Sequence, residues 1–298
     1  MIAFGSSITA PAVYERHAWS GFRRAGETDS VILSRRAEGS IFHSYNAILE
    51  QAAAYEDLEA LVLAHQDVEI VDSAFCEKVR RVLSDPDVGV IGCVGAIGVR
   101  SIAWWEGSVT WASFVHRYAE LGGGEFPSLT WSDAEMPPYA RRGEVDTVDG
   151  LLMVLSPWAV RNLRFDESLG QPLHGYDFDF CLQVRAAGRK VIAEDLRVYH
   201  HHSLALVDSP DPYVEAHRRV AEKWDGRLAH VGEAPGDWKT RARRAEAEAS
   251  ATRAQVRSWQ LSIDVRRRRH ERAMSEIAGS LSLRLTEPLR RLRRQPPR

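Results

Sequence analysis

The stretch Ala60-Leu61-Val62-Leu63-Ala64-His65-Gln66-Asp67-Val68 carries the clearest indication of both fold and chemistry in this chain. Its first five residues are small or apolar, which is typical of a strand covered on both faces of a sheet. His65 and Asp67 follow at the carboxyl end of that strand, where ligands bind in open α/β sheets. An imidazole and a carboxylate at this position predict a site for a divalent cation, and a cation can bind a diphosphate.

The surrounding sequence alternates between short apolar runs and helical patterns. We predict strands at 2–8, 31–34, 60–64, 88–93, 148–155, 190–193 and 196–199, and helices at 11–24, 44–55, 72–83, 177–187 and 211–224. This alternation indicates an α/β fold with a mostly parallel central sheet and helices on both faces. Between 98 and 145 the periodicity fades, which is typical of a long lid or binding loop.

Composition places the chain among ordinary globular proteins. It has 298 residues, of which 44% are hydrophobic and 27% charged, and no apolar run reaches the length of about 18 residues that a membrane span needs. The N-terminal sequence lacks the basic region and long apolar core of a signal peptide. The three cysteines, Cys76, Cys93 and Cys181, are scattered, as expected in a reducing compartment. We therefore expect a cytoplasmic protein.

Charge and composition change near residue 236, so we predict an α/β domain over 1–235 and an extended helix with a basic tail over 236–298. Residues 238–298 contain 17 basic and 6 acidic side chains, although the whole chain has a net charge of −2. A basic end suggests an anionic partner, and an amphipathic one fits an anionic membrane surface better than nucleic acid. The helix over 240–277 is also a candidate for pairing with a second copy of the chain.

Further acidic and imidazole side chains follow downstream. Asp177 and Asp179 begin a predicted helix, where a carboxylate either stabilises the free backbone N–H groups or acts as a general base. Asp149 precedes a strand, either as a turn residue or as a contact for a substrate hydroxyl. In the run His200-His201-His202, side chains 200 and 202 share one face of an extended backbone, so one of them can be a second metal ligand.

Taken in order, these pieces resemble family 2-type glycosyltransferases of the GT-A fold, in the branch with His-Gln-Asp in place of Asp-x-Asp. The resemblance covers about residues 1–225. It is carried by the segments IAFGSSI, SIFHSYNAILEQA, LVLAHQDVEI, VGVIGCVGA followed by WWEG, VDGLLMVLS, HGYDFDFCLQVRAAGRKV and DLRVYHHHS.

The resemblance implies a nucleotide-diphosphate-sugar donor and a divalent metal, Mn or Mg. His65 and Asp67 occupy the positions of the metal triplet, and His200 matches the metal-side histidine near the end of the domain. Ser6 and Asn46 are expected to join His65 and Asp67 in binding the donor. One departure from the family is His65 itself, which replaces an acidic residue.

The same resemblance implies inversion at the anomeric carbon, with Asp177 as the catalytic base. Tyr176 stands before it where many members have Glu. Tryptophans in the 98–145 segment can stack on sugar faces or fill the core. The residues expected to contact substrate are Trp104, Trp105, Asp149, His174 and Asp179.

Sugar transfer to a glycan or lipid-linked acceptor in surface polysaccharide synthesis is therefore the expected function, in the cytoplasm or peripherally at the inner face of the membrane. Two alternatives remain. A nucleotidyltransferase would need a glycine-rich basic loop after the first strand, whereas residues 6–11 contain neither Gly nor Lys. A non-catalytic scaffold that binds glycans or a partner would keep the fold and use the long helix for interaction.

Overall fold

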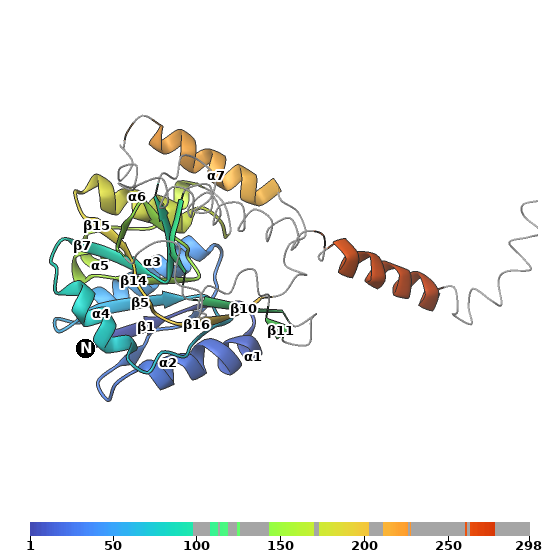
Figure 1. Ribbon diagram of the computed structural model, residues 1–298, viewed down its shortest axis with the longest axis horizontal. Coiled ribbons are helices and arrows are strands. Elements are labelled where there is room, and N and C mark those ends of the chain that lie inside the picture. The colour runs from blue at the N-terminus through green and yellow to red at the C-terminus, as the bar shows by residue number, and fades with distance from the viewer. Residues whose placement is uncertain are drawn as a thin grey trace, which may run out of the picture.

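The computed structural model describes residues 1–97, 108–112, 114–118, 124–125, 143–169, 173–202, 211–225, 227, 260 and 263–277. Its largest sheet has seven strands in the order β12-β15-β7-β14-β5-β1-β3 (Figure 1). Five of these strands run in one direction, and β12 and β14 run in the other. The strand bounds are Ile2–Gly5 (β1), Val31–Ile32 (β3), Ala60–Ala64 (β5), Val88–Gly92 (β7), Gly143–Val145 (β12), Leu152–Leu155 (β14) and Lys190–Ala193 (β15).

Helices cover both faces of this sheet, as Figure 1 shows. On one face α3 packs so closely that a Cβ on Gly5 would lie 2.8 Å from the Ile48 side chain. On the other face the rings of Phe22 and Phe75 lie 5.3 and 6.2 Å from that of Phe4. The prediction of a mostly parallel sheet between two helical layers is confirmed. The helices are Ser20–Ala25 (α2), Ile41–Ala53 (α3), Phe75–Leu83 (α4), Pro157–Asn162 (α5), Tyr176–Ala186 (α6) and Asp211–Trp224 (α7).

The central strand β5 has the burial that its composition predicts. All five of its side chains are fully buried between β1 and β14. Removing a Leu or Val side chain from water contributes about 1.5–3 kcal/mol. The strand therefore holds the turn that follows it, with His65 and Asp67, in a fixed position.

The segment 98–145 contains more regular structure than the sequence suggests. Strands β9 (Ser108–Ala112) and β10 (Phe114–Tyr118) lie within it, so the prediction of an irregular segment is wrong for these residues. β10 pairs in parallel with β16 (Val198–His202), which in turn pairs antiparallel with β6 (Val68–Ile70). Partners on both sides extend β16 through the histidines, beyond the predicted end at 199. The shorter strands are Ser7–Ile8 (β2), Arg35–Arg36 (β4), Val94–Ile97 (β8), Gly124–Glu125 (β11) and Thr147–Val148 (β13).

The first predicted helix is divided in a way the sequence does not reveal. A short helix α1 (Pro11–Tyr14) leads into a five-residue π-helical turn, η1 (Glu15–Trp19), before α2 begins. The chain approaches β6 directly after this turn. A Cβ on Gly21 would lie 2.5 Å from the backbone nitrogen of Ile70, so a larger residue would push the helix away from the strand.

Helix α7 is attached to α6 through the carboxylate of Asp179. This side chain is fully buried and accepts hydrogen bonds from Trp224 Nε1 and Gln183 Nε2, both at 2.7 Å. It also forms an ion pair with Lys223 at 2.7 Å. A carboxylate with these partners and no exposed surface holds two helices together, and we assign this structural role to Asp179. Its expected contact with substrate stays a prediction.

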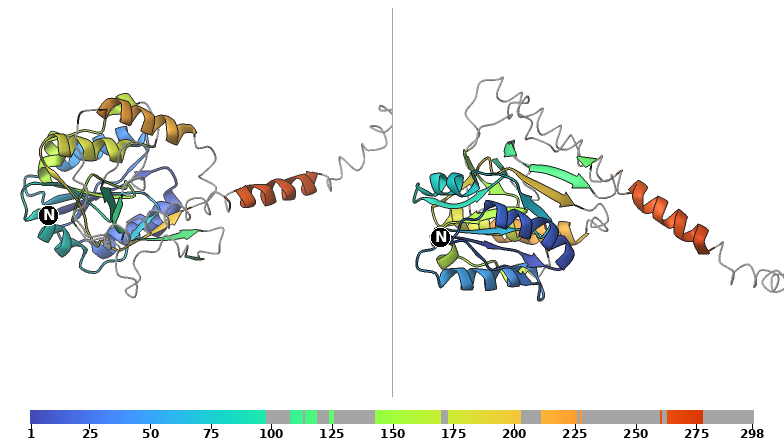
Figure 2. Two further views of the ribbon diagram at one scale, coloured as in Figure 1. Left: turned by 45° about the horizontal axis from the view of Figure 1, so that its top comes forward. Right: turned by 90° about the horizontal axis from the view of Figure 1, so that it is seen from below.

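The C-terminal part of the described chain is a helix over residues 263–277, drawn in red and standing clear of the α/β body in Figure 2. Its larger apolar side chains, Ile263, Met274 and Ile277, are more than half exposed. Within the described residues, no helix combines the length and apolarity that a membrane span requires. The proposed boundary at 235/236 lies outside those residues.

Replacing Asp179 tests the α6–α7 attachment. Asp179→Ala leaves Lys223 with one acceptor fewer and buries an unpaired indole N–H, so we expect the free energy of unfolding to fall by about 3 kcal/mol. Glu222→Ala removes an exposed pair with Arg218 on the same helix and should change stability by less than about 1 kcal/mol. Urea unfolding of both variants measures the difference, and equal effects would contradict the assigned role.

Candidate active site

Three potential metal ligands meet where β5 ends. The ligand atoms of His65, Asp67 and His200 all lie within 4.8 Å of one another, and His200 Nε2 is 3.4 Å from Asp67 Oδ1. His65 and Asp67 are in the turn between β5 and β6, and His200 lies on β16 opposite Val68 of β6. The turn and two neighbouring strands thus bring together residues that are 135 positions apart.

Gln66, the middle residue of the His-Gln-Asp triplet, bonds to the protein backbone and is not part of the cation cluster. The Gln66 amide oxygen accepts hydrogen bonds from the backbone N–H groups of Thr9 and Ala10, at 2.9 and 2.7 Å. Its nitrogen donates to Thr9 Oγ1 at 2.6 Å. Gln66 therefore ties the turn that carries the ligands to the loop before α1.

Asp149 reaches the same edge because β14 runs antiparallel to β5. Leu152, the first residue of β14, is paired with Ala64, the last residue of β5, so the segment before β14 lies beside the end of β5. The His65 N–H donates to the Leu151 carbonyl at 3.0 Å. Within this segment the Leu151 N–H donates to Asp149 Oδ1 at 2.8 Å.

The predicted base, Asp177, lies in the first turn of α6, against the same segment. Its Oδ2 accepts a hydrogen bond from the Gly150 N–H at 2.8 Å. Burial, together with the negative charge of Asp149, raises the pKa of Asp177 to about 7. A carboxylate with such a pKa takes up and releases a proton near neutral pH, as a general base must.

Tyr176 fixes the orientation of His65. Its hydroxyl lies 2.9 Å from the Gly150 carbonyl and 2.6 Å from His65 Nε2. Since the carbonyl can only accept, the single hydroxyl proton goes to Gly150, and His65 Nε2–H donates to the hydroxyl. This assigns the lone pair to Nδ1, the atom that remains for a cation. A Cβ on Gly150 would lie 2.2 Å from the Tyr176 oxygen, so only glycine fits there.

The two ligand histidines differ in their electrostatic surroundings. Burial lowers the pKa of His65, which keeps the ring neutral and able to bind a cation. For His200 burial acts in the same direction, but the nearby Asp67 carboxylate outweighs it and raises the pKa. A cation at the cluster would compete with a proton on His200.

The histidine run is divided between the two faces of β16. His200 belongs to the cluster with Asp67, whereas His201 Nε2 lies 3.0 Å from Glu69 Oε2 in a separate group. The side chain of His202 is outside the described part. Of the two histidines whose side chains are described, His200 is the one in the cluster with His65 and Asp67.

His174, a predicted substrate contact, is half-buried beside the cluster. Burial lowers its pKa to about 4, and the neighbouring His217 and His65 add to the shift. His217 is a buried residue of α7 whose ring meets Phe178 edge to face, with centroids 5.2 Å apart; no spacing pattern in the sequence pointed to it. Trp104 and Trp105 lie outside the described residues.

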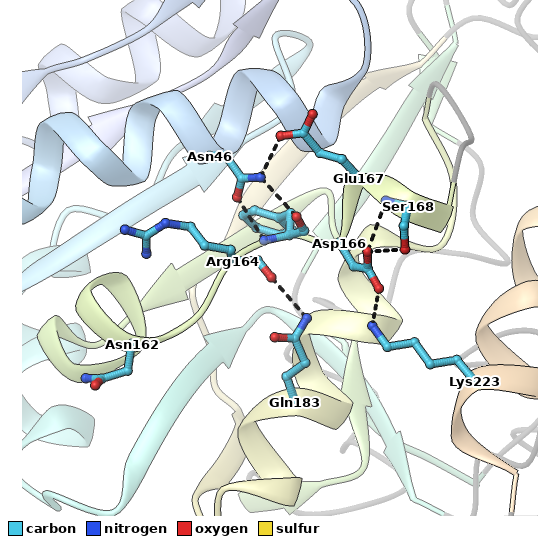
Figure 3. Close-up of a pocket in the computed structure, with 9 residues that line it drawn as sticks. Asn46, Asn162, Arg164, Asp166, Glu167, Ser168, Gln183 and Lys223 are labelled. Carbon is cyan, nitrogen blue, oxygen red and sulfur yellow. Dashed lines mark hydrogen bonds and ion pairs between the residues drawn. The ribbon is translucent and has the colours of Figure 1, made fainter.

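The two remaining donor-binding candidates have structural partners. Ser6 is fully buried, and its hydroxyl donates to the Ala64 carbonyl at 2.8 Å, which links the ends of β1 and β5. Asn46 donates to the Phe165 carbonyl and to Glu167, and accepts from the Phe165 N–H. Asn46 also lines a pocket of about 560 Å³, and Figure 3 shows it next to Glu167. Both side chains thus have partners within the protein, and their contact with the donor stays a prediction.

Comparisons with known proteins identify the family of this chain. The family described as "Glycosyltransferase like family" matches residues 27–223. The chain is 32% identical over 209 residues to the streptomycin biosynthesis protein StrF of Streptomyces griseus, covering 68% of this chain and 67% of StrF. It is 26% identical over 166 residues to the O-antigen biosynthesis protein RfbC of Myxococcus xanthus, covering 54% of this chain and only 12% of RfbC.

Among solved structures, the chain is similar to the mannosyltransferase PcManGT from Pyrobaculum calidifontis in complex with GDP-Man and Mn²⁺. That alignment has a TM-score of 0.45 and 13% identity, and covers 95% of this chain and 81% of the other. The match to the family spans every residue of the cation cluster and both carboxylates beside it. This chain belongs to the glycosyltransferase-like family and is a glycosyltransferase.

Proposed function

We propose that the protein transfers a sugar from a nucleoside-diphosphate donor to a hydroxyl group of a glycan or lipid-linked acceptor, with inversion at the anomeric carbon. The observation that carries this proposal is the meeting of a cation cluster and a carboxylate of raised pKa at one edge of the sheet. The proposed direct displacement needs both features, one at the leaving diphosphate and one at the attacking hydroxyl.

The cluster fits a divalent transition-metal ion. It offers two imidazoles and one carboxylate, whose ligand atoms lie within 4.8 Å of one another, and Tyr176 already orients His65 through its other nitrogen. This donor set suits Mn²⁺ better than Mg²⁺, which prefers oxygen ligands. When bound, the cation would supply Lewis-acid stabilisation of the departing diphosphate.

Asp177 would accept the proton of the acceptor hydroxyl as that oxygen attacks the anomeric carbon. The Gly150 N–H fixes one carboxylate oxygen, so the base is held by the same backbone segment that adjoins His65. General-base catalysis of this kind contributes about 10²–10⁴-fold in rate. Asp149 raises the pKa of Asp177 and so brings the base near the pH at which it works. It would also contact a substrate hydroxyl.

The names of the relatives support a biosynthetic role, since StrF is a streptomycin biosynthesis protein and RfbC an O-antigen biosynthesis protein. A glycan or lipid-linked acceptor in surface polysaccharide synthesis fits the second of these. We place the reaction in the cytoplasm, at the inner face of the membrane.

The basic tail supports that location. Residues 238–298 carry an excess of basic side chains. Each Lys or Arg near an anionic membrane surface contributes about 1 kcal/mol to the free energy of binding. We expect the full chain to sediment with vesicles of phosphatidylglycerol but not of phosphatidylcholine, and the chain lacking 238–298 to stay in the supernatant. Equal sedimentation of both chains would contradict membrane binding by the tail.

Light scattering of the same two proteins tests pairing through the helix over 240–277. We expect the full chain to scatter as a dimer and the chain lacking 238–298 to scatter as a monomer.

Asp177→Asn tests the base directly. The amide keeps the size and the Gly150 hydrogen bond but cannot accept a proton, so we expect kcat to fall by about 10²–10⁴-fold. Binding of nucleoside diphosphate with Mn²⁺ should remain, as measured by calorimetry. Asp85→Asn, at the opposite edge of the sheet before β7, is the matched control and should leave turnover unchanged. Near-normal transfer by Asp177→Asn would exclude the role.

The pH profile provides a second reading of the same assignment. Because the base must be ionised, kcat/KM should rise with pH to a plateau. The pKa of Asp177 is about 7 without a cation, and a bound cation lowers it. Asp149→Asn removes a negative charge that raises this pKa, so the acidic limb should move to lower pH. An unchanged limb would show that the titrating group is not Asp177.

A further inference from the structure

A second group of potential ligands lies on the opposite side of β16 from the active site. It consists of His17 in η1, Glu69 in β6 and His201 in β16, and their ligand atoms also lie within 4.8 Å of one another. Successive side chains of a strand point to opposite faces, so His200 faces the first cluster while His201 faces this one. All three residues are partly exposed, which leaves a path for an ion from solvent.

We propose that this group is a second cation site, which binds Zn²⁺ or a similar late transition-metal ion and fastens the N-terminal helical segment to the strands beside the active site. The assignment is independent of the proposed reaction, because none of the three residues belongs to the first cluster.

The donor set is the same as in the first cluster, two imidazoles and one carboxylate. Two imidazoles and one carboxylate are a combination that zinc accepts with a fourth position left to water. His201 Nε2 and Glu69 Oε2 are 3.0 Å apart. Two ligands of one zinc ion are separated by about 2.8–3.4 Å when each bond is about 2.0–2.1 Å long and the angle between them is about 90–109°. The pair therefore fits around an ion with little movement.

The carboxylate of Glu69 is already oriented for such binding. Arg24 donates to Oε1 at 2.8 Å and to the Ile70 carbonyl at 3.1 Å, while Oε2 faces His201. A ligand whose second oxygen is held by a hydrogen-bond donor is the arrangement found around many metal centres. Arg24 thus serves as the outer partner of the site rather than as a competitor for Oε2.

The π-helical turn places His17 over the strand. Close packing of Gly21 on Ile70 holds the helix against β6, and the rings of His17 and His201 stack with centroids 3.7 Å apart at an interplanar angle of 18°. Parallel rings cannot direct their lone pairs at one ion, so His17 must rotate about its side-chain bonds on binding. π-Helical turns of this kind occur frequently at functional sites.

Equilibrium dialysis with zinc tests the second cluster separately from the first. In an Asp67→Ala/His200→Ala background the first cluster is disabled, and we expect one Zn²⁺ per chain to remain, measured by equilibrium dialysis and atomic emission. Adding His17→Ala or Glu69→Gln to this background should weaken that binding by more than about tenfold. His43→Ala, which removes a half-exposed histidine outside both clusters, is the matched control and should change nothing.

The melting temperature provides a readout that does not depend on counting ions. Zinc should raise the melting temperature of the Asp67→Ala/His200→Ala protein but not of the same protein with His17→Ala added. Circular dichroism without zinc confirms that each variant is folded. If the variant with His17→Ala fails to fold, the variant with Glu69→Gln takes its place in the comparison, because glutamine keeps the shape of the glutamate side chain. A background protein that binds no zinc, or binding unaffected by both substitutions, would overturn the site.

Discussion

The geometry of the active site depends on the antiparallel pairing of β14 with β5. This pairing brings the three residues 149–151 to the point where β5 ends. Three groups then use this short segment: His65 bonds to the Leu151 carbonyl, Tyr176 to the Gly150 carbonyl, and Asp177 to the Gly150 N–H. A parallel strand in the place of β14 would end at this edge instead of beginning there, and the segment would be absent.

The site also concentrates negative charge in a buried place. Asp67, Asp149 and Asp177 approach one edge of the sheet, and burial with the Asp149 charge raises the pKa of Asp177. Such an arrangement costs stability, because buried carboxylates are stable only with compensating partners. His200 near Asp67 supplies part of the compensation, and a divalent cation would supply more. The mutual repulsion of these buried carboxylates is thus the physical reason to expect tight cation binding.

Much of this organisation could be predicted from the sequence, because strand burial follows directly from composition. The run 60–64 predicts β5, and the position of a residue after such a strand predicts the place of His65 and Asp67. Composition does not reveal which hydrogen bonds a polar side chain makes. Ser6, Asn46 and Asp179 therefore resembled ligand contacts in sequence, although the structure gives them partners in Ala64, the 165–167 segment and α7.

Contacts between distant segments were the other part that sequence could not supply. Tyr176 departs from the family pattern, and only the fold shows that its hydroxyl orients His65. His17 sits in a π-helical turn that helical periodicity does not predict, so its approach to His201 has no sequence signal. The pairing of β10 with β16 likewise joins segments about 80 residues apart.

The central claim is that one cation binds His65, Asp67 and His200 next to Asp177. Crystals soaked with Mn²⁺ and a nucleoside diphosphate, measured at the manganese absorption edge, test it most directly. The account predicts an anomalous peak within bonding distance of those three side chains, with the diphosphate against it. A peak at other residues, or a diphosphate bound away from this edge of the sheet with no metal beside it, would contradict the account.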